Sequence, residues 1–425
     1  MFPKEYTVSG FSSLGLNKTL IATLASSNYS EPTPIQAQAI PLIIEGCDVM
    51  AGAQTGTGKT AAFALPILHN LMASSKQASA SNGVKALVLA PTRELAQQIH
   101  TNFEKYSAGT GLKIGLAYGG ASLSVQITAL KQGVDVLVAT PGRLIDFIFK
   151  KAIQLDQLEY LVFDEADRML DMGFKDEINM ILKRVPSERQ TLLFSATLDD
   201  GIFKLSKTLM KKPKLIEVSG RNAVATEVEQ VVYNVDADRK RELMSHMIGS
   251  KNWKQVLIFT RTKQDADELA KEMCKDGIKT QSIHGDKSQG ARDKALTDFK
   301  EGNIRALTAT DVAARGIDIP DLKYVFNYQL PYIAEDYIHR IGRTGRNGES
   351  GLAISLLSVG EEYLLEEIEA IIDTRLNQQW LQGYEPDLTK VVKTDRKNTK
   401  TAQKRRAKKR AYGQPTGNSR KPDRK

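Results

Sequence analysis

The stretch Ala53-Gln54-Thr55-Gly56-Thr57-Gly58-Lys59-Thr60 is the part of the chain from which the fold is best predicted. It follows a short apolar run, residues 48–51, typical of a buried strand, and precedes an apolar segment, residues 61–72, typical of a helix. A glycine-rich loop at such a junction can turn its backbone N–H groups around a phosphate. Lys59 would then reach the outer phosphates of a triphosphate, and the Thr60 hydroxyl would bind Mg²⁺. The first position is alanine where the usual pattern has glycine, so a chance loop is the alternative.

The composition is that of a globular protein with more than one domain. A chain of 425 residues is long enough for about two domains, and 41% hydrophobic residues are sufficient for a core in each. The two cysteines, Cys47 and Cys274, lie far apart in the sequence, which is typical of reduced thiols. Residues 1–16 lack a basic stretch followed by an apolar core, and no apolar run approaches the roughly 20 residues of a membrane span. We therefore expect a soluble, cytoplasmic protein.

The positive charge is concentrated at the end of the sequence. Residues 393–425 contain 14 Lys and Arg against two Asp, so residues 1–392 carry −3 of the total of +9. This tail has too few apolar residues to fold alone, and we expect it to be disordered. It would attract a polyanion through counterion release, and a solvated tail without a partner is the alternative.

Strand-like runs in the first half each end in a polar motif and are followed by a helical pattern. The runs are residues 86–90, 134–139, 160–163 and 191–194, and the motifs are Pro91-Thr92-Arg93-Glu94, Thr140-Pro141-Gly142-Arg143, Asp164-Glu165-Ala166-Asp167 and Ser195-Ala196-Thr197. This alternation predicts a parallel sheet with helices on both faces. The carboxyl ends of such strands line one crevice, so we expect these motifs to lie together.

Asp164 and Glu165 carry the strongest chemical signal of this half. A carboxylate at the end of an apolar strand, beside a phosphate loop, can hold Mg²⁺ through water. An adjacent carboxylate can orient and deprotonate an attacking water molecule. Each residue could instead be an acidic N-cap of the following helix, but two carboxylates after four apolar residues favour the metal site.

The second half repeats the alternation without a second phosphate loop. Regular patterning is lost around residues 215–226, where we predict a linker, and it restarts at Val228. The strand-like runs are residues 256–259, 280–283, 304–307, 324–327 and 351–356. The predicted organisation is therefore two α/β domains, residues 1–216 and 228–375, a linker at 217–227, and an extension at 376–425 whose basic tail starts near 393. Residues 376–392, with Trp380 and Tyr384, could cap the second domain.

Two further segments carry polar groups in unusual settings. The stretch from His339 to Arg346 has too much positive charge among glycines to be expected in a core. Its arginines could bind phosphate from across a cleft, and a solvated basic loop is the alternative. Earlier in the chain, Pro32 and Pro34 hold the segment before Gln36 out of a helix. An aromatic ring and an amide could recognise adenine there, although alone the segment indicates only a helix start.

Together, these motifs in this order resemble those of a DEAD-box ATP-dependent RNA helicase. The resemblance covers roughly residues 9–375, and Asp171-Met172-Gly173-Phe174 with the basic tail is most similar to the bacterial RhlE-like branch. It implies two RecA-like domains with ATP and Mg²⁺ in the cleft between them. Single-stranded RNA would lie across both domains.

The resemblance implies roles for residues around the nucleotide. Phe11 would stack on adenine, Gln36 would bond its edge, and Thr33 would support that loop. The phosphates and Mg²⁺ would be held by Ala53, Gln54, Thr55, Gly56, Thr57, Gly58, Lys59 and Thr60. The residues implied in hydrolysis are Asp164 as metal ligand through water, Glu165 as general base, His339 near the acidic motif, and Arg343 and Arg346 as arginine fingers. Asp318 would contact the ribose.

The resemblance also implies an RNA path. The RNA backbone would meet Thr92, Arg93, Gly119, Gly120, Thr140, Gly142 and Arg143 in the first domain, and Thr260, Arg261, Gly285, Thr310 and Arg315 in the second. Ser195 and Thr197 would bond the acidic motif and couple the nucleotide state to RNA. Contacts to phosphate and sugar position a strand without reading its sequence, so we expect little sequence preference and discrimination from DNA through the 2′-hydroxyl.

Because neither domain alone holds both the phosphate loop and the arginines, hydrolysis should require closure driven by ATP and RNA. The helix near Leu144 is a plausible wedge that bends one strand, which predicts local, nonprocessive duplex opening. An ATP-gated RNA clamp with little unwinding and a DNA translocase are the competing hypotheses. The family resemblance further implies a monomeric core that acts in ribosome assembly or RNA turnover.

Overall fold

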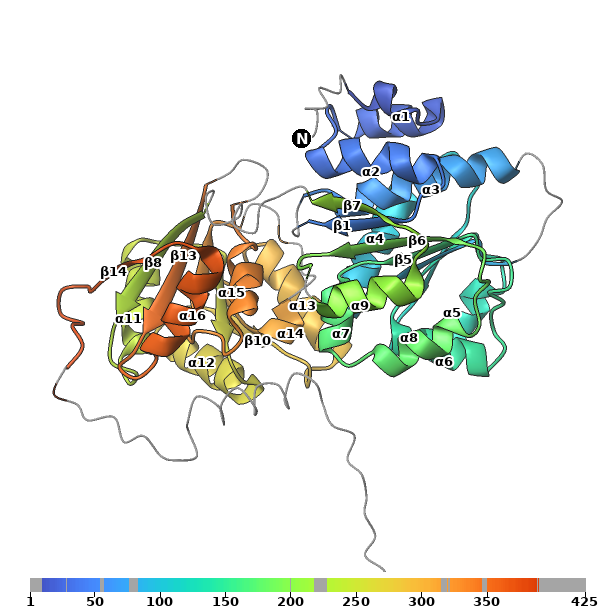
Figure 1. Cartoon of the computed structure of the whole chain (residues 1–425). Coiled ribbons are helices and arrows are strands. Elements are labelled where there is room, and N and C mark those ends of the chain that lie inside the picture. The colour runs from blue at the N-terminus through green and yellow to red at the C-terminus, as the bar shows by residue number, and fades with distance from the viewer. Residues whose placement is uncertain are drawn as a thin grey trace, which may run out of the picture.

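The computed structural model describes residues 10–27, 29–53, 57–75, 83–198, 200–217, 228–314, 319, 322–345, 350–387 and 389. These residues form two α/β domains, each built around a seven-stranded parallel sheet with helices on both faces (Figure 1). The predicted fold class, two tandem RecA-like domains, is confirmed. The phosphate-loop positions 54–56, the linker positions 218–227 and the basic tail lie outside the described residues.

The first domain has the strand order β3-β4-β2-β5-β6-β1-β7. Its strands are β1 (Val49–Gly52), β2 (Ala86–Leu89), β3 (Ile114–Ala117), β4 (Val136–Ala139), β5 (Tyr160–Phe163), β6 (Gln190–Ser195) and β7 (Lys214–Glu217). Its helices are η1 (Phe11–Leu14), α1 (Lys18–Ser26), α2 (Pro34–Ile44), α3 (Lys59–Ser75), α4 (Arg93–Tyr106), α5 (Leu123–Leu130), α6 (Pro141–Phe149), α7 (Ala166–Asp171), α8 (Lys175–Leu182) and α9 (Asp200–Leu209).

The second domain has the strand order β10-β11-β9-β12-β13-β8-β14. Its strands are β8 (Val228–Asn234), β9 (Val256–Thr260), β10 (Thr280–Ile283), β11 (Ala306–Thr310), β12 (Tyr324–Asn327), β13 (Gly351–Leu357) and β14 (Asn377–Gln379). Its helices are α11 (Lys240–Ser250), α12 (Lys263–Lys275), α13 (Gln289–Lys300), α14 (Asp311–Ala314), α15 (Ala334–Ile341) and α16 (Glu362–Ile372).

The sequence pattern misses three of the four strands at the edges of the described sheets and predicts the fourth, β10. β3, β7 and β14 each lie at the end of a sheet and bury few or no side chains. β7 contains Leu215 and Ile216, where the loss of patterning suggests a linker. An edge strand is covered on fewer sides than a central strand, so its sequence lacks the continuous apolar run by which the central strands are recognised.

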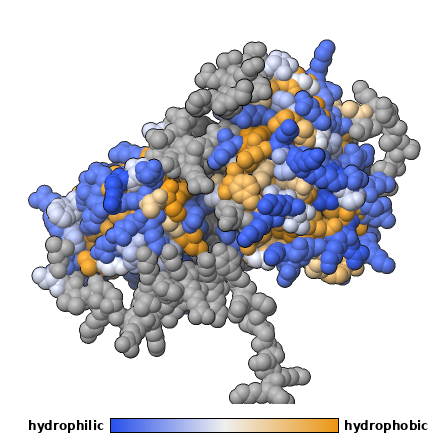
Figure 2. Space-filling view, viewed as in Figure 1, coloured by the Kyte–Doolittle hydropathy of each residue, from blue (hydrophilic) through white to orange (hydrophobic). Residues whose placement is uncertain are grey.

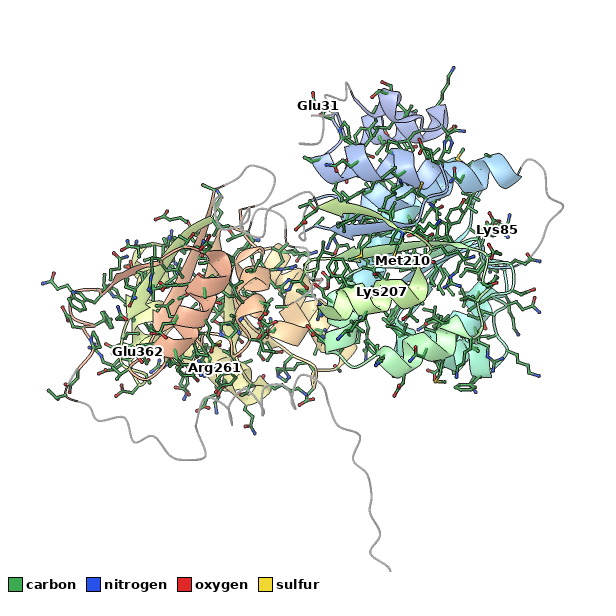
Figure 3. The ribbon with its side chains drawn as sticks, viewed as in Figure 1. Glu31, Lys85, Lys207, Met210, Arg261 and Glu362 are labelled. Carbon is green, nitrogen blue, oxygen red and sulfur yellow. The ribbon has the colours of Figure 1, made fainter. Side chains whose placement is uncertain are left out.

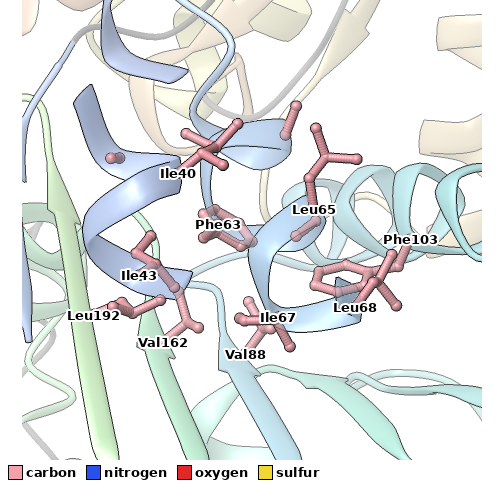
Figure 4. Close-up of a cluster of buried hydrophobic side chains, with 14 of the residues drawn as sticks. Ile40, Ile43, Phe63, Leu65, Ile67, Leu68, Val88, Phe103, Val162 and Leu192 are labelled. Atoms are coloured by element: carbon pink, nitrogen blue, oxygen red, sulfur yellow. The ribbon is translucent and has the colours of Figure 1, made fainter. Parts of the chain in front are cut away.

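The first-domain core lies in two layers, one on each face of the sheet. Successive strand residues alternate between them: Leu192 and Phe194 pack on one face, while Leu193 packs on the other. Helices α2, α3 and α4 cover the first face, and Phe63 of α3 lies at the centre of that layer (Figure 4). Its ring centroid is 5.2 Å from that of Phe194 and 6.1 Å from that of Phe103. This layer fixes the helix that follows the phosphate loop.

The second-domain core is built in the same way. Leu257 and Phe259 of β9 face α13 and α14, while Val256 and Ile258 face α11 and α12. Residues 376–387 add to this domain, because β14 pairs with β8 and Tyr384 packs against the core. Residues 376–387 therefore pack on the second domain, and a cap formed by the whole segment 376–392 stays a prediction.

The surface is predominantly hydrophilic on the face shown in Figure 2, where apolar side chains form separated patches. Among the described residues, no helix combines the length and the apolar character needed to span a membrane.

Truncation of Phe63 tests the contribution of the α2–α3–α4 layer. Phe63 is fully buried, so Phe63→Ala should lower the free energy of unfolding of the first domain by about 3–5 kcal/mol through lost burial and the cavity left behind. Urea unfolding followed by circular dichroism measures this change. Phe203→Ala removes a ring that is 40% exposed and should have a much smaller effect. Equal losses in both variants would contradict the assignment of Phe63 to the core.

Candidate active site

Lys59 is the first residue of α3 and points its ammonium group into the protein. The side chain is 6% exposed, and among the described residues Nζ has no hydrogen-bond partner. A buried ammonium without a hydrogen-bond acceptor is unfavourable unless another group supplies one. Its position, at a helix N-terminus directly after the glycine-rich loop, fits a phosphate group. The donor set therefore suits the triphosphate predicted from the sequence.

Gln36 and Thr33 support the phosphate loop from α2. Thr33 Oγ1 donates to the Thr57 carbonyl at 2.8 Å, and Gln36 Nε2 donates to the Gly58 carbonyl at 3.1 Å. Gln36 Oε1 accepts from the Thr33 N–H at 2.9 Å, so both polar atoms of this buried amide are engaged. Gly58 has φ +89°, and a Cβ there would lie 2.3 Å from Gln36 Nε2. Both side chains are thus tied to the phosphate loop, and recognition of adenine by Gln36 stays a prediction.

Phe11 lies in η1 and is 4% exposed. It borders a pocket of about 600 Å³ that is also lined by Tyr29, Ser30, Ile21 and Leu24. A mainly apolar pocket with an aromatic wall is suited to a planar base. Stacking of adenine on Phe11 stays a prediction.

Asp164 and Glu165 follow β5 and are almost fully buried. Asp164 Oδ1 accepts from the Glu165 N–H at 3.0 Å, which orients this carboxylate. Glu165 has φ 54° and ψ 54°, a left-handed conformation that is uncommon outside glycine and costs about 1–3 kcal/mol. Its carboxylate lies 3.3 Å from Arg168 NH1. A strained backbone therefore holds an ion-paired carboxylate beside the phosphate loop.

The pKa values of the two adjacent carboxyls are shifted in opposite directions. Burial raises the pKa of Asp164 to about 6, although nearby Lys59 opposes this. Burial would also raise the pKa of Glu165, but Arg168 and Lys59 outweigh it and lower that pKa to about 2. Glu165 is therefore an ionised carboxylate at neutral pH, whereas Asp164 is held in an environment that a bound cation would compensate.

Asp167 connects the acidic motif to the segment after β6. Its Oδ2 accepts from the Ala196 N–H at 3.1 Å, the Thr197 N–H at 3.0 Å and the Thr197 hydroxyl at 3.2 Å. The predicted bond between the acidic motif and Thr197 is thus present. The one predicted for Ser195 is absent, because its hydroxyl is buried within β6 and has no hydrogen-bond partner among the described residues. The coupling role of both residues stays a prediction.

Side chains of both domains line one small cavity beside Glu165. Its walls are Glu165, Asp167, Arg168, Asp171, His339 and Arg343, and its volume of about 10 Å³ admits roughly one water molecule. His339 and Arg343 come from the second domain and also lower the pKa of Glu165. The structure therefore brings both of these predicted residues to the acidic motif. Asp318 and Arg346 lie outside the described residues.

The expectation that the His339–Arg346 stretch is too charged for a core is wrong. Arg340 is 1% exposed and Arg343 is 4% exposed. Arg340 donates to both carboxylate oxygens of Asp311, at 2.6 and 2.8 Å, and to the Gln329 carbonyl at 2.6 Å. Its guanidinium also lies 5.1 Å from the ring centroid of Phe259. A bidentate ion pair with further acceptors offsets the desolvation of the guanidinium, which charge counting along the sequence does not reveal.

The predicted RNA-contact residues of the first domain follow the carboxyl ends of β2, β3 and β4. Thr92 and Thr140 are the N-cap residues of α4 and α6. A Cβ on Gly119 or Gly142 would meet no atom within 4 Å, so both backbones have open space above them. Arg143 is 8% exposed and donates to the Ala121 carbonyl at 3.0 Å, so its guanidinium braces this loop from inside.

Contacts between the domains join α4 to α13 and involve Arg292 and Gln289, to which the sequence analysis assigned no role. Arg292 of α13 forms a 2.6 Å ion pair with Glu94 of α4, and both side chains are nearly buried. Arg93 NH1 donates to Gln289 Oε1 at 3.1 Å, and a Cβ on Gly120 would lie 2.1 Å from the same nitrogen. Only the adjacency of Glu94 to the predicted contact Arg93 hinted at this role. Arg93 is therefore positioned at the junction of the two domains.

In the second domain, two predicted RNA contacts face inward. Thr260 is fully buried, and its hydroxyl donates to the Thr262 carbonyl at 3.2 Å. Arg261, labelled in Figure 3, donates to the Leu330 carbonyl and to Glu361, both at 2.6 Å. These hydrogen-bond partners lie within the second domain, and contact of either residue with RNA stays a prediction.

Gly285 follows the end of β10, and Thr310 is the last residue of β11, as expected. Gly285 is exposed directly after β10, and Thr310 is 8% exposed at the end of β11. Arg315 lies outside the described residues. The two positions lie at the carboxyl edge of the second sheet, as the predicted first-domain contacts do in the first.

Residues 33–205 match the family described as DEAD/DEAH box helicase, and residues 239–348 match the family described as Helicase conserved C-terminal domain. The ATP-dependent RNA helicase CshA of Listeria monocytogenes is 42% identical over 366 residues, which are 86% of this chain and 69% of the relative. The chain belongs to the DEAD-box ATP-dependent RNA helicases. The family predicted from the motifs is confirmed.

Another relative and two solved structures are similar to this chain over most of its length. The DEAD-box ATP-dependent RNA helicase RhpA of Helicobacter pylori is 40% identical over 371 residues, 87% of this chain and 74% of the relative. The structure of S. cerevisiae Dbp5 bound to RNA and ADP BeF3 has a TM-score of 0.77 at 30% identity, covering 88% of this chain and 96% of that one. The structure of Mss116p bound to ssRNA and AMP-PNP has a TM-score of 0.79 at 29% identity, with coverages of 89% and 81%.

The pH dependence of stability tests the opposite pKa shifts of Asp164 and Glu165. Because the pKa of Asp164 is about 6 in the folded helicase and 3.8 ordinarily, the native state keeps a proton that the unfolded chain releases between these values. Its burial therefore destabilises the protein increasingly from pH 4 to pH 6. The free energy of unfolding of Asp164→Asn should equal that of the unchanged protein at pH 4. At pH 7.5 it should be higher by up to about 3 kcal/mol. Urea unfolding in EDTA measures this difference.

Glu165→Gln is the matched control, with the opposite sign. The pKa of Glu165 lies below its ordinary value, so its ionised form stabilises the native state above about pH 4.5, and this contribution is lost as the pH falls toward 2. The Gln variant should therefore be less stable than the unchanged protein at pH 7.5. A pH-independent difference in either variant would contradict the assigned environments.

Proposed function

We propose that this helicase hydrolyses ATP only when RNA and ATP bring its two domains together, and that closure separates short RNA duplexes locally and nonprocessively. The observation that carries this proposal is the shared cavity, in which Glu165 of one domain lies with His339 and Arg343 of the other. Hydrolysis needs a base to orient water and cations to offset the charge that develops on the phosphates. Because the base and the cations lie on separate domains, ATP turnover depends on the two domains coming together.

In this proposal, Lys59 binds the outer phosphates, and Thr60 and Asp164 hold Mg²⁺, partly through water. The unsatisfied Nζ of Lys59 and the raised pKa of Asp164 support these roles. The described residues contain no cluster of three or more acidic, His or Cys side chains suited to a metal. This agrees with Mg²⁺, which usually keeps several waters and binds through one or two carboxylates together with substrate phosphates. The bound ion would neutralise charge on the phosphates.

Glu165 acts as the general base. Its lowered pKa keeps it ionised, and the adjoining cavity has room for the water molecule that it would orient. Arg343, with Arg346, stabilises the charge on the transferring phosphoryl group, while Asp318 contacts the ribose. His339 lies beside the acidic motif, and this contact depends on the position of the second domain.

RNA crosses the carboxyl edges of both sheets. Gly119 and Gly142 leave their backbones accessible, which suits close approach of a sugar-phosphate chain. The similar structures of Dbp5 and Mss116p have RNA and ssRNA bound, respectively. α6, which begins at Pro141, is the proposed wedge, and the basic tail from Lys393 tethers structured RNA. We propose a cytoplasmic role in ribosome assembly or RNA turnover.

A bacterial RhlE-like assignment is the finer proposal within this family. It rests on Asp171-Met172-Gly173-Phe174 and on the basic tail. The relatives reported above carry the names CshA and RhpA. A monomeric core is likewise a proposal.

Stimulation of the ATPase by nucleic acid is the experiment that tests the proposed coupling. ATP turnover is measured in Mg²⁺ without nucleic acid, with single-stranded RNA, and with single-stranded DNA of the same sequence. We expect strong stimulation by RNA alone. Turnover indifferent to RNA would overturn the coupling, and stimulation by DNA would favour a translocase. Long residence on RNA with a non-hydrolysable ATP analogue, without strand separation, would indicate a clamp.

Two substitutions separate the roles within the composite site. Arg343→Ala should lower ATP turnover by about 10³-fold or more and spare ATP affinity, because the arginine acts on the transition state. Glu165→Gln should lower turnover by about 10²- to 10⁴-fold. Steady-state kinetics and nucleotide binding measure both effects. Glu188→Gln, which removes an exposed carboxylate paired with Lys211, is the control that should leave turnover unchanged.

Equal losses of ATP affinity and turnover in Arg343→Ala would argue against a transition-state role. Full turnover in Glu165→Gln would show that another group activates the water.

A further inference from the structure

The C-terminal segment after α16 is a folded strap, residues 376–387, on the outer edge of the second sheet. β14 pairs in parallel with β8, with Asn377 opposite Val231 and Gln379 opposite Tyr233. In Figure 1, β14 lies on the side of the second domain away from the first domain. The strap is thus remote from the nucleotide cleft.

Contacts on both sides of residue 380 hold the strap in place. Before it, the Leu376 N–H donates to Glu369 Oε1 at 2.9 Å. After it, the Tyr384 ring lies 5.6 Å from the His246 ring and 4.7 Å from the Arg239 guanidinium, measured to the ring centroid. The Asp387 N–H donates to Asp236 Oδ1 at 3.2 Å. The backbone at residue 380 is therefore anchored from both directions.

Trp380 presents its ring to solvent from this anchored backbone. The residue is 62% exposed, whereas the other tryptophan, Trp253, is 8% exposed and stacks on Tyr324. A large aromatic ring left in water forgoes the stabilisation that burial would bring. Because its backbone is already fixed, this ring can bind a planar group at low entropic cost.

The surroundings of Trp380 favour a nucleobase over a protein. Among the described residues of the second domain, the other large hydrophobic side chain with substantial exposure is Val359, at 38%. Protein-binding anchors are normally surrounded by further exposed apolar side chains, and this domain offers few of them among its described residues. Its sequence neighbours are the amides Gln378, Gln379 and Gln382, whose donors and acceptors match base edges.

The charged side chains of the strap favour contact with a base over contact with a phosphate. Glu385 and Asp387 are exposed carboxylates on the strap, where they disfavour a phosphate. The next cationic residues in the sequence are Lys390 and Lys393. A single strand would therefore contact the strap through a base stacked on the ring and not through a phosphate.

We propose that Trp380 stacks on an unpaired base of RNA and forms a second RNA contact outside the cleft. This proposal rests on the RNA binding of the proposed function and adds a site to it. The strap positions the ring. Stacking of this kind tolerates any base, so the contact holds single-stranded RNA without sequence preference.

Tryptophan fluorescence of the full chain tests the contact directly, because Trp380 is the exposed one of the two tryptophans. The probes are a 12-nucleotide oligouridylate, an abasic ribose-phosphate chain of the same length, and a blunt RNA duplex, each added without ATP. We expect the oligouridylate to quench the emission and the abasic chain and the duplex to leave it nearly unchanged. Trp380→Phe should abolish the quenching because only the buried Trp253 then emits.

Affinity measurements separate stacking from a structural effect. Trp380→Ala should weaken oligouridylate binding by about 5- to 150-fold, the range expected for one stacked base, and Trp380→Phe should restore most of it. Phe203→Ala, which removes an exposed aromatic ring from the first domain, should leave the affinity unchanged. Unchanged affinity in Trp380→Ala would overturn the proposal.

Other results of these two experiments would also contradict the stacking proposal. Equal quenching by the abasic chain would show a phosphate contact and overturn stacking. Emission that changes with protein concentration but not with RNA would show that a second copy covers the ring, which also overturns it. If RNA stimulates the ATPase but leaves Trp380 emission unchanged, this inference alone fails. If the unchanged protein neither binds RNA nor responds to it, the proposed function fails with it.

Discussion

The structure depends on how the buried charge of Glu165 is compensated. This carboxylate sits at a left-handed backbone position and is ion-paired with Arg168 at 3.3 Å. Lys59 adds positive charge from the phosphate loop, and Arg343 and His339 add it from the other domain. A buried anion is tolerated only with such partners. Its compensation therefore joins the acidic motif, the phosphate loop and the second domain in one electrostatic unit.

Adjacent residues extend this unit into the rest of the protein. Asp167 binds the backbone of Ala196 and Thr197, which precede α9. On the other side of the cleft, the Glu94–Arg292 pair joins α4 to α13. Arg93, next to Glu94, is both a predicted RNA contact and a partner of Gln289. A change at Arg93 would thus act on the same junction that joins the two domains.

Some site residues could be predicted from the sequence and others could not. Lys59, Asp164 and Glu165 follow strands in a recognisable order, so their common location follows from the geometry of parallel sheets. Arg261 and Arg340 belong to equally basic motifs but face inward, because Glu361 and Asp311 lie within reach. Gln36 turns to the Gly58 carbonyl for a similar reason. The acceptor that a donor finds depends on chain segments far away in the sequence.

The sequence by itself determined the two α/β domains, the order of the motifs and the family, because strand periodicity and loop chemistry are local properties. Only the tertiary structure decided which arginines are buried, which edge strands complete the sheets and which residues join the domains. Trp380 shows the difference clearly. Its position next to a basic tail is visible in the sequence, but its exposure follows from the pairing of β14 with β8. Burial is a property of packing between distant segments, and no local pattern specifies it.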